Sequence, residues 1–210
     1  MSSSPPETDS ETDACTAVAT PSNSSPLDES SGSIAPRRWL LFWLIALGGM
    51  AFDLTTKTII FERVGPPPSV AVSIVHNVLE LRTSYNRGAL WGLGRNLPNS
   101  PLFFAGLSIG AALAILYYLF VMGAARDRRL TVALGLIMAG ALGNCYDRLF
   151  LGQVRDFVHF HVDPIGFDCA IFNFADNMLI AGAVILMLLA FRPDAAPAEL
   201  DNPEPIHQTS

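Results

Sequence analysis

The stretch LTVALGLIMAGALGNCYDRLF, residues 130–150, decides how the rest of the chain is interpreted. It is uncharged until Asp147 and Arg148, which follow each other directly near its end. A helix needs roughly 20 predominantly apolar residues to cross the hydrocarbon core of a bilayer. Small residues four positions apart, here Ala139 and Gly143, are typical of helices that pack closely within membranes. The stretch therefore predicts a transmembrane helix, and its charged end is either an ordinary membrane exit or part of a site.

Three other stretches have the same apolar character. The chain is 50% hydrophobic and 15% charged, whereas an average soluble domain carries roughly 25% charge. The expected spans are Trp39–Phe61, Leu102–Ala125, Leu130–Tyr146 and Ala170–Phe191. A long acidic segment precedes the first span and no small-x-small cleavage site follows it, so we expect it to stay as an anchor. The sequence thus predicts an all-α membrane protein with four transmembrane helices.

The two ends of the chain differ in composition from this apolar middle. Residues 1–36 contain six acidic residues, lack Lys and Arg, and are rich in Ser, Thr and Pro. Such a segment buries too little apolar surface to fold alone. We expect a disordered acidic extension over 1–36, a four-helix transmembrane domain over 37–192 and a disordered tail over 193–210. The net charge of −6 comes largely from the extension, and we expect no nucleic-acid partner.

Basic residues in short connections predict the orientation of the spans. They are Arg37, Arg38, Arg126, Arg128, Arg129 and Arg192. By the positive-inside rule these connections and both termini are cytoplasmic. The opposing loop, 62–101, also carries four arginines, so the bias is modest.

The loop 62–101 is too long to be a simple connection. Its segment VLELRTSY (78–85) alternates, with Leu79, Leu81, Thr83 and Tyr85 on one side and Glu80, Arg82 and Ser84 on the other, which is typical of a half-buried strand. The segment VRDFVHFHV (154–162) alternates less clearly. We expect a small extracytoplasmic β element that rests on the helices.

The polar residues of the spans gather near one membrane surface. They are Asp53, Lys57, Asn144, Asp147, Arg148, Asn173 and Asp176, with Asn86 and Asp156 in the adjoining loops. Reversing the topology moves all of them together, so the clustering does not depend on the charge bias. Asp53 and Lys57 are four residues apart and suit a structural ion pair. Asp176 lies in an apolar run without a basic residue at helical spacing, and an intramembrane carboxylate of this kind indicates function.

Histidine and cysteine residues point less strongly to a site. His159 and His161 are two residues apart and share one side of a strand, which suits a metal, but no third ligand has matching spacing, and we expect ordinary surface histidines. Cys15, Cys145 and Cys169 show no C-x-x-C spacing or histidine pairing, so neither a disulfide framework nor a zinc site is indicated.

Two other classes of protein also place carboxylates in a membrane. A transporter or proton channel needs polar residues through the whole bilayer, whereas the second span is uncharged and the inner halves of the others are apolar. A scaffold protein needs no carboxylate pair and would tolerate its loss. Among proteases, no H-E-x-x-H motif is present. Tyr146-Asp147 is similar to a presenilin-type motif, but the second motif, G-x-G-D, is missing.

Four segments together resemble one enzyme family. FDLTTK (52–57), YNRGALWGLG (85–94), AGALGNCYDRLFLGQVRDFVHF (139–160) and FNFADNMLI (172–180) have the order and spacing of lipoprotein signal peptidase, or signal peptidase II, the aspartic peptidase family A8. The resemblance covers about 38–191. Each motif alone is weak, but G-N-x-x-D-R, V-x-D-F and F-N-x-A-D in succession on a four-span background are specific.

The resemblance implies an enzyme of the bacterial inner membrane with its active site near the extracytoplasmic surface. Its catalytic dyad corresponds to Asp156 and Asp176. The supporting and substrate-binding positions correspond to Asp53, Lys57, Asn86, Gly88, Asn144, Asp147, Arg148 and Asn173. The family removes signal peptides from prolipoproteins, cleaving before a diacylglyceryl-modified cysteine, with no metal or organic cofactor. The partners implied are the prolipoprotein and membrane lipids; oligomeric state is left open.

The chain departs from the family pattern at a few positions. Leu54 stands where the first motif usually has Gln, and Cys145 where an aliphatic residue is common. In the loop motif, Leu90 replaces a small residue and Trp91 replaces Phe. None of these is in the dyad, so we expect the chemistry to be kept and the contact of that loop with substrate to differ.

Overall fold

A computed structural model describes residues 36–88, 93, 94 and 96–191. Of the acidic extension predicted over 1–36, residues 1–35 lie outside the described residues, as do the C-terminal tail and the loop positions Leu90 and Trp91, whereas Pro36 begins a helix.

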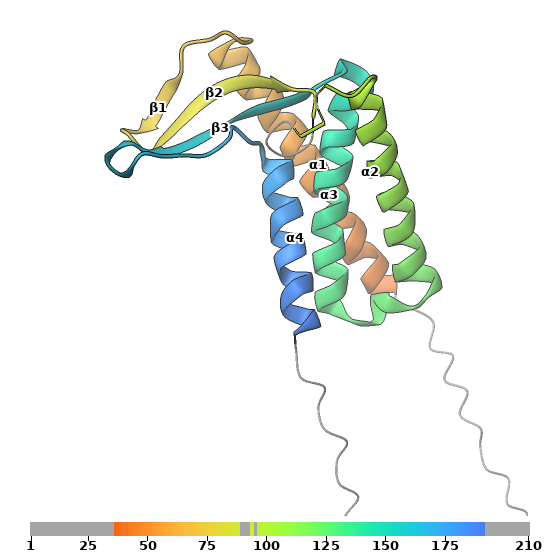
Figure 1. Cartoon of the computed structure of the whole chain (residues 1–210). Coiled ribbons are helices and arrows are strands. Elements are labelled where there is room, and N and C mark those ends of the chain that lie inside the picture. Colours follow the sequence, from red (N-terminus) through yellow and green to blue (C-terminus); the bar gives the residue numbers. More distant parts are fainter. Residues whose placement is uncertain (1–35, 89–92, 95, 192–210) are drawn as a thin grey trace, which may run out of the picture. The chain divides into compact units, whose positions relative to one another are not determined.

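Four helices pack side by side (Figure 1). They are α1 (Pro36–Val64), α2 (Ser100–Leu116), α3 (Arg128–Leu151) and α4 (Phe174–Ala190). A π-helical turn, Tyr117–Val121, continues α2, and a 3-10 turn, Ala124–Arg126, leads to α3. Arg37–Val64, Ser100–Val121 and Arg128–Leu151 are long and apolar enough to cross a membrane, whereas α4 has 17 residues. The described part of the chain is thus mostly helical, with three membrane-capable helices and a shorter apolar fourth.

Two of the predicted spans have wrong boundaries. The helix expected from Leu102 to Ala125 is interrupted at Gly123, whose φ of 75° lies in the left-handed region. The span expected from Ala170 becomes helical only at Phe174. The residue Phe172 instead exchanges backbone hydrogen bonds with Val158 of the sheet. Pairing with the sheet therefore takes precedence over the apolar pattern at the start of α4.

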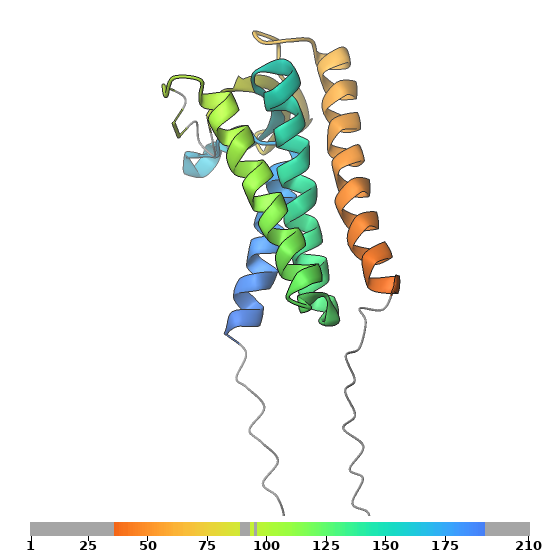
Figure 2. The ribbon, with the colours of Figure 1, turned by 90° about the vertical axis from the view of Figure 1, so that its right-hand side faces the viewer.

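Helix α3 lies at the centre of the helices, between α1 and α2 in Figure 2, and also packs against α4. Its small residues permit this close approach. A Cβ atom on Gly140 would collide with the carbonyl oxygen of Ala175 in α4, and one on Gly143 would lie 2.5 Å from Asp53 Oδ2 in α1. The packing role predicted for this stretch is thereby confirmed.

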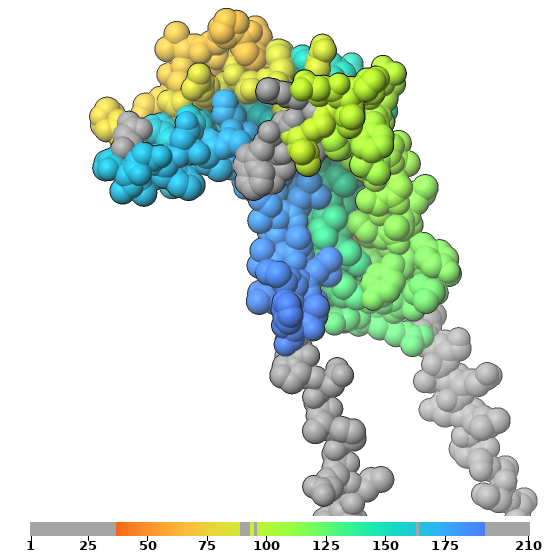
Figure 3. Space-filling model, viewed as in Figure 1, coloured from red at the N-terminus to blue at the C-terminus, as the bar shows by residue number. Residues whose placement is uncertain are grey.

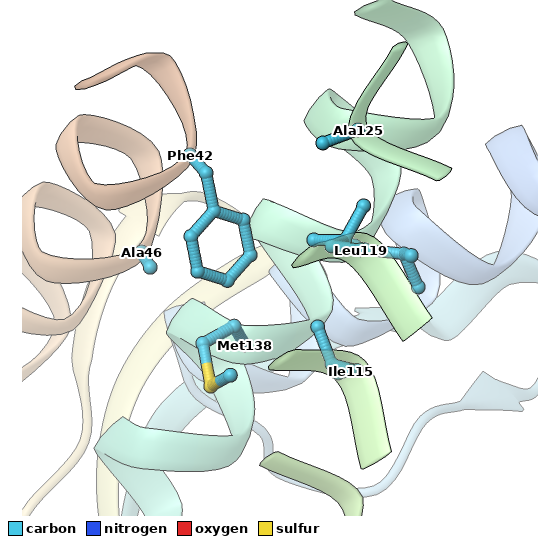
Figure 4. Close-up of a cluster of buried hydrophobic side chains, with 7 residues drawn as sticks. Phe42, Ala46, Ile115, Leu119, Ala125 and Met138 are labelled. Atoms are coloured by element: carbon cyan, nitrogen blue, oxygen red, sulfur yellow. The ribbon is translucent and has the colours of Figure 1, made fainter. Parts of the chain in front are cut away.

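An apolar cluster fills the space between α1, α2 and α3 at the end where α3 begins. Its buried side chains are Phe42, Ala46, Ile115, Leu119, Ala125, Leu134 and Met138 (Figure 4). At the opposite end of the helices the buried side chains are largely polar, and the candidate site lies there.

An antiparallel sheet lies at that opposite end (Figure 1). Its strands, in spatial order, are β1 (Val72–Val75), β2 (Leu79–Asn86), β3 (Val154–Val162) and β4 (Phe167–Asp168). A 3-10 turn, Asp163–Ile165, joins β3 to β4. The space-filling view shows the sheet overhanging α4 (Figure 3). The strand predicted over 78–85 is confirmed as β2, and the weaker pattern over 154–162 forms β3.

A β-bulge corrects the predicted faces of β2. Leu81 pairs with Val158, but Ser84 pairs with Asp156, so β2 holds one more residue than β3 between these two pairs. The uninterrupted alternation expected from Glu80 to Ser84 is therefore wrong, because a bulge reverses the side of the sheet toward which the following residues point. Glu80, before the bulge, and Ser84, after it, therefore point to opposite sides of the sheet.

Candidate active site

A cavity of about 160 Å³ lies where the sheet meets α3 and α4. Its polar lining comprises Asn86, Asn144, Arg148, Asp156, Asp176 and Asn177, and its apolar lining includes Val154, Ile171, Phe172 and Ile180. Both aspartates implied by the family resemblance therefore line one cavity. A lining that contains both polar and apolar groups suits a ligand that has both characters.

Asp156 projects from β3 and is 3% exposed. Asn173 Nδ2 donates a hydrogen bond to its Oδ1 at 2.6 Å, and Asn86 Nδ2 donates to its Oδ2 at 3.2 Å. Asn86 is in turn oriented by the backbone N–H of Gly88, which donates to Asn86 Oδ1 at 2.9 Å. The bulge in β2 matters here, because it turns Asn86 and Asp156 to the same side of the sheet.

Asp176 is the third residue of α4 and closes a capping box with Asn173. The Asp176 N–H donates to Asn173 Oδ1 at 3.0 Å, and the Asn173 N–H donates to Asp176 Oδ2 at 3.3 Å. Asn144 Nδ2 donates to Asp176 Oδ1 at 2.8 Å. The position expected for Asp176, about seven residues into the fourth span, is corrected, because α4 begins four residues later than expected and leaves Asp176 in its first turn.

Lys57 of α1 is fully buried and connects α1 to α3. Its Nζ lies 2.7 Å from Asp53 Oδ2 and 3.3 Å from Asp147 Oδ2, and it donates to Asn144 Oδ1 at 2.9 Å. The contact between Asp53 and Lys57 confirms the predicted ion pair. Because Asn144 accepts from Lys57 and donates to Asp176, the buried cation fixes which way the Asn144 amide points.

Asp147 forms an ion pair with Arg155, which was not among the predicted site residues. Arg155 donates to the Asp147 carboxylate from its backbone N–H at 3.0 Å and from Nη2 at 2.8 Å. Arg148, next to Asp147 in the chain, instead donates from Nη2 to the carbonyl oxygen of Gly88 at 3.0 Å. Arg155 directly precedes the aspartate of the V-x-D-F motif. The only feature of the sequence that could have pointed to it is its position next to Asp156 on a predicted strand, where the two side chains alternate between the faces.

The surroundings of Asp156 favour its protonated form. Burial raises the pKa of the Asp156 carboxyl to about 7, and the charge of Asp176 acts in the same direction. Hydrogen bonds donated by Asn173 and Asn86 oppose this effect by stabilising the carboxylate. Two carboxyl groups in one cavity, one with a pKa near neutrality, provide an acid and a base for the same reaction.

Comparisons with known proteins support the same interpretation. A family model described as Signal peptidase (SPase) II matches residues 45–192. The chain belongs to the signal peptidase II family. A lipoprotein signal peptidase of Rhodopirellula baltica is 35% identical over 189 residues, which cover 83% of each chain.

Solved structures agree with this signal peptidase II assignment. Two structures described as a bacterial membrane enzyme, determined by the in meso method at 2.3 and 1.9 Å resolution, each have a TM-score of 0.63. The first is 30% identical and covers 75% of this chain and 89% of its own; the second is 29% identical and covers 78% and 97%. The chain is accordingly a membrane peptidase of aspartic type by family, which decides against the transporter and scaffold alternatives.

Proposed function

We propose that Asp156 and Asp176 form the catalytic dyad with which this signal peptidase II removes signal peptides from prolipoproteins. The observation that carries the proposal is the position of Asn173. Its side chain donates to Asp156 at 2.6 Å, while its backbone N–H donates to Asp176 at 3.3 Å. One residue at the start of α4 thus holds both carboxyl groups at the same cavity.

The proposed reaction is hydrolysis by an activated water molecule. Asp176, as carboxylate, takes a proton from water while the water oxygen attacks the scissile carbonyl carbon. Asp156, in its protonated form, donates a hydrogen bond to the carbonyl oxygen. The tetrahedral intermediate collapses with cleavage of the C–N bond, and the leaving amine receives the proton taken from water. The reaction returns the dyad with one shared proton and requires no redox step.

Substrate-binding and positioning roles follow from which groups reach the cavity. Asn86, Asn144 and Arg148 line it and are proposed to bind the substrate backbone. Gly88 positions Asn86 and Arg148 through its backbone N–H and carbonyl. Asp53, Lys57 and Asp147 are buried beneath the cavity and hold Asn144 and β3 in place. Asn173 completes the set by contacting both aspartates.

The apolar lining supports a lipid-modified substrate. Ile171, Phe172 and Ile180 face the cavity beside the polar groups. We propose that the diacylglyceryl chains of the modified cysteine lie toward this apolar side and remain in the bilayer, with the peptide bond before that cysteine at the dyad. Because the acyl chains are buried in lipid both before and after binding, they contribute by keeping the precursor at the membrane and not by a gain in apolar burial.

The proposed orientation uses both ends of the helices. α4 is taken as the fourth span of the transmembrane domain over 37–192, despite its 17 residues. Arg37, Arg38 and Arg128 line one pocket at the end where α1 and α3 begin. We assign this end and both termini to the cytoplasmic side, which places the sheet and the dyad at the extracytoplasmic surface.

The dyad is tested by Asp156→Asn and Asp176→Asn. Each variant should abolish processing, so that lipidated, uncleaved precursor accumulates, while membrane insertion and protein level stay at those of wild type. Asp127→Asn is the matched control, because Asp127 caps the first turn of α3 away from the cavity and Asn caps equally well. Near wild-type cleavage by either dyad variant refutes the assignment.

A further inference from the structure

Four polar side chains meet on the sheet, on the side opposite to the one that carries Asp156. Glu80 of β2 pairs directly with His159 of β3, and His161 of β3 pairs directly with Asp168 of β4. Residues opposite each other in a ladder, and residues two apart on one strand, share a face. The register therefore brings these four side chains together, which we call the sheet cluster.

The geometry of the sheet cluster resembles that of a metal site. His159 Nδ1 lies 2.7 Å from Glu80 Oε1, and His159 Nε2 lies 2.7 Å from Asp168 Oδ1. One potential ligand atom each from Glu80, His159 and His161 lies within 4.8 Å of the other two. The cluster lines a cavity of about 440 Å³, which leaves room for an ion and its water ligand.

We propose that Glu80, His159 and His161 bind a divalent transition-metal ion, with zinc as the best fit. Imidazole nitrogen and carboxylate oxygen are ordinary zinc ligands at about 2.0–2.2 Å. Tetrahedral geometry at that length separates the ligand atoms by about 3.4 Å. The 2.7 Å between His159 Nδ1 and Glu80 Oε1 must therefore widen by about 0.7 Å, and the widest separation, at most 4.8 Å, must contract by up to about 1.4 Å.

Asp168 has a different role in this arrangement. A histidine that binds a metal through one ring nitrogen usually donates its other N–H to a carboxylate, which fixes the ring. His159 has this arrangement, with Nδ1 toward Glu80 and Nε2 at Asp168. The charges are also compatible, since Glu80 and Asp168 offset the two positive charges of the ion.

The ion would join β2 to β3 on the side opposite to the catalytic cavity. β3 carries both His159 and Asp156, and β2 carries both Glu80 and Asn86. The metal is thus assigned a structural role in the sheet that holds the dyad, separate from the hydrolytic chemistry. The prediction of ordinary surface histidines missed this cluster, because the third ligand is supplied by the pairing of β2 with β3 and not by local spacing.

The test uses Co²⁺ as a probe on the full-length protein in detergent micelles, after removal of metals with EDTA. Co²⁺ with four nitrogen and oxygen ligands absorbs strongly in the visible region, so one equivalent should produce a saturating band that Zn²⁺ then removes. Zn²⁺ at about 100 times its dissociation constant should also raise Tm by about 5 °C or more.

Two variants test the ligands and one serves as the control. His161→Ala should abolish the band and the zinc-dependent rise in Tm, and Asp168→Asn should weaken Co²⁺ affinity about 10- to 100-fold. His76→Ala, at an exposed histidine between β1 and β2, should bind as wild type. The proposal is overturned if wild type produces no band, if His161→Ala binds Co²⁺ like wild type, or if His76→Ala loses binding. Absence of the band identifies the cluster as a hydrogen-bonded ion-pair network only.

Discussion

Cleavage is expected to slow as the pH rises above about 7, because the proposed mechanism needs a proton on Asp156. Burial, together with the charge of Asp176, raises the pKa of the Asp156 carboxyl to about 7. Above that pH the acid form is lost, so kcat/KM should fall about tenfold per pH unit. Asn86→Ala is the perturbation that tests this cause, since it removes a hydrogen bond that stabilises the carboxylate.

The size of the expected shift follows from that hydrogen bond. Asn86 Nδ2 donates to Asp156 Oδ2 at 3.2 Å, which is long for a bond to a charged group. Such bonds contribute about 1.5–3 kcal/mol, and at this length we take about 1.4 kcal/mol, which corresponds to one pKa unit. Asn86→Ala should therefore move the alkaline limb to higher pH by up to about one unit. The maximum rate also falls, because Asn86 is proposed to bind substrate, but the midpoint of the limb does not depend on the maximum.

The assay follows cleavage of a synthetic lipidated precursor peptide by the purified full-length enzyme in micelles, under kcat/KM conditions from about pH 5 to about pH 9. Asp127→Asn is the control and should keep the wild-type limb. A rate that stays constant across this range refutes the acid role of Asp156. A limb that moves to lower pH in Asn86→Ala refutes the proposed cause of the shift.

The same pKa predicts a change in stability with a defined sign. The folded pKa of about 7 lies above the ordinary value of 3.8, so this group contributes stability at low pH that is lost as the pH rises through 7. The difference of about 3 units corresponds to about 4 kcal/mol in total, of which about 3 kcal/mol is lost between about pH 5 and pH 8. The side chain of Asn does not titrate in Asp156→Asn. The free energy of unfolding of this variant should therefore rise relative to that of wild type by about 3 kcal/mol between about pH 5 and pH 8.

Two further predictions concern packing and buried charge. Lys57→Met leaves Asp53 buried without its cation and should lower the free energy of unfolding by about 3–5 kcal/mol. Denaturation in mixed micelles measures this loss, and a loss below about 1 kcal/mol contradicts the buried ion pair. Gly140→Ala forces a Cβ against the carbonyl oxygen of Ala175 and should cost about 1–3 kcal/mol. The matched control Gly106→Ala, with no atom within 4 Å of the added Cβ, should be neutral or stabilising, and equal losses for the two variants refute the close contact between α3 and α4.

Much of the helical part was predictable because the lipid environment selects apolar residues at each position of a membrane-spanning helix. A helix in hydrocarbon must be apolar along its length, so α1 was recognised from composition to within three residues of its ends, whereas α3 continues five residues beyond the expected end at Tyr146. The start of α4 was misplaced, because Phe172 is as apolar as a helix residue but pairs with Val158 in the sheet. Composition does not distinguish an apolar strand residue from an apolar helix residue.

The candidate site was predictable as a set of residues but not as a set of contacts. The polar residues at one end of the spans, and the motifs around Asp156 and Asp176, were readable from the chain alone. Arg155 was passed over, since an arginine in a strand carries no local signal that it will reach Asp147. The single lysine shows the same limit, because its spacing predicts the pair with Asp53 but not the contact with Asn144 that orients the amide at Asp176.

The sequence by itself determined that the chain is a membrane protein, which stretches form its apolar helices, though not all of their ends, and which carboxylates are candidates for catalysis. These properties follow from the partition of side chains between water and lipid, which depends on the composition of each continuous stretch of sequence. Only the tertiary structure decided that Asn173 contacts both aspartates, and that the bulge in β2 turns Asn86 toward Asp156 while leaving Glu80 with His159. Such contacts depend on strand register and on the approach of helices far apart in the chain, and neither is encoded in local periodicity.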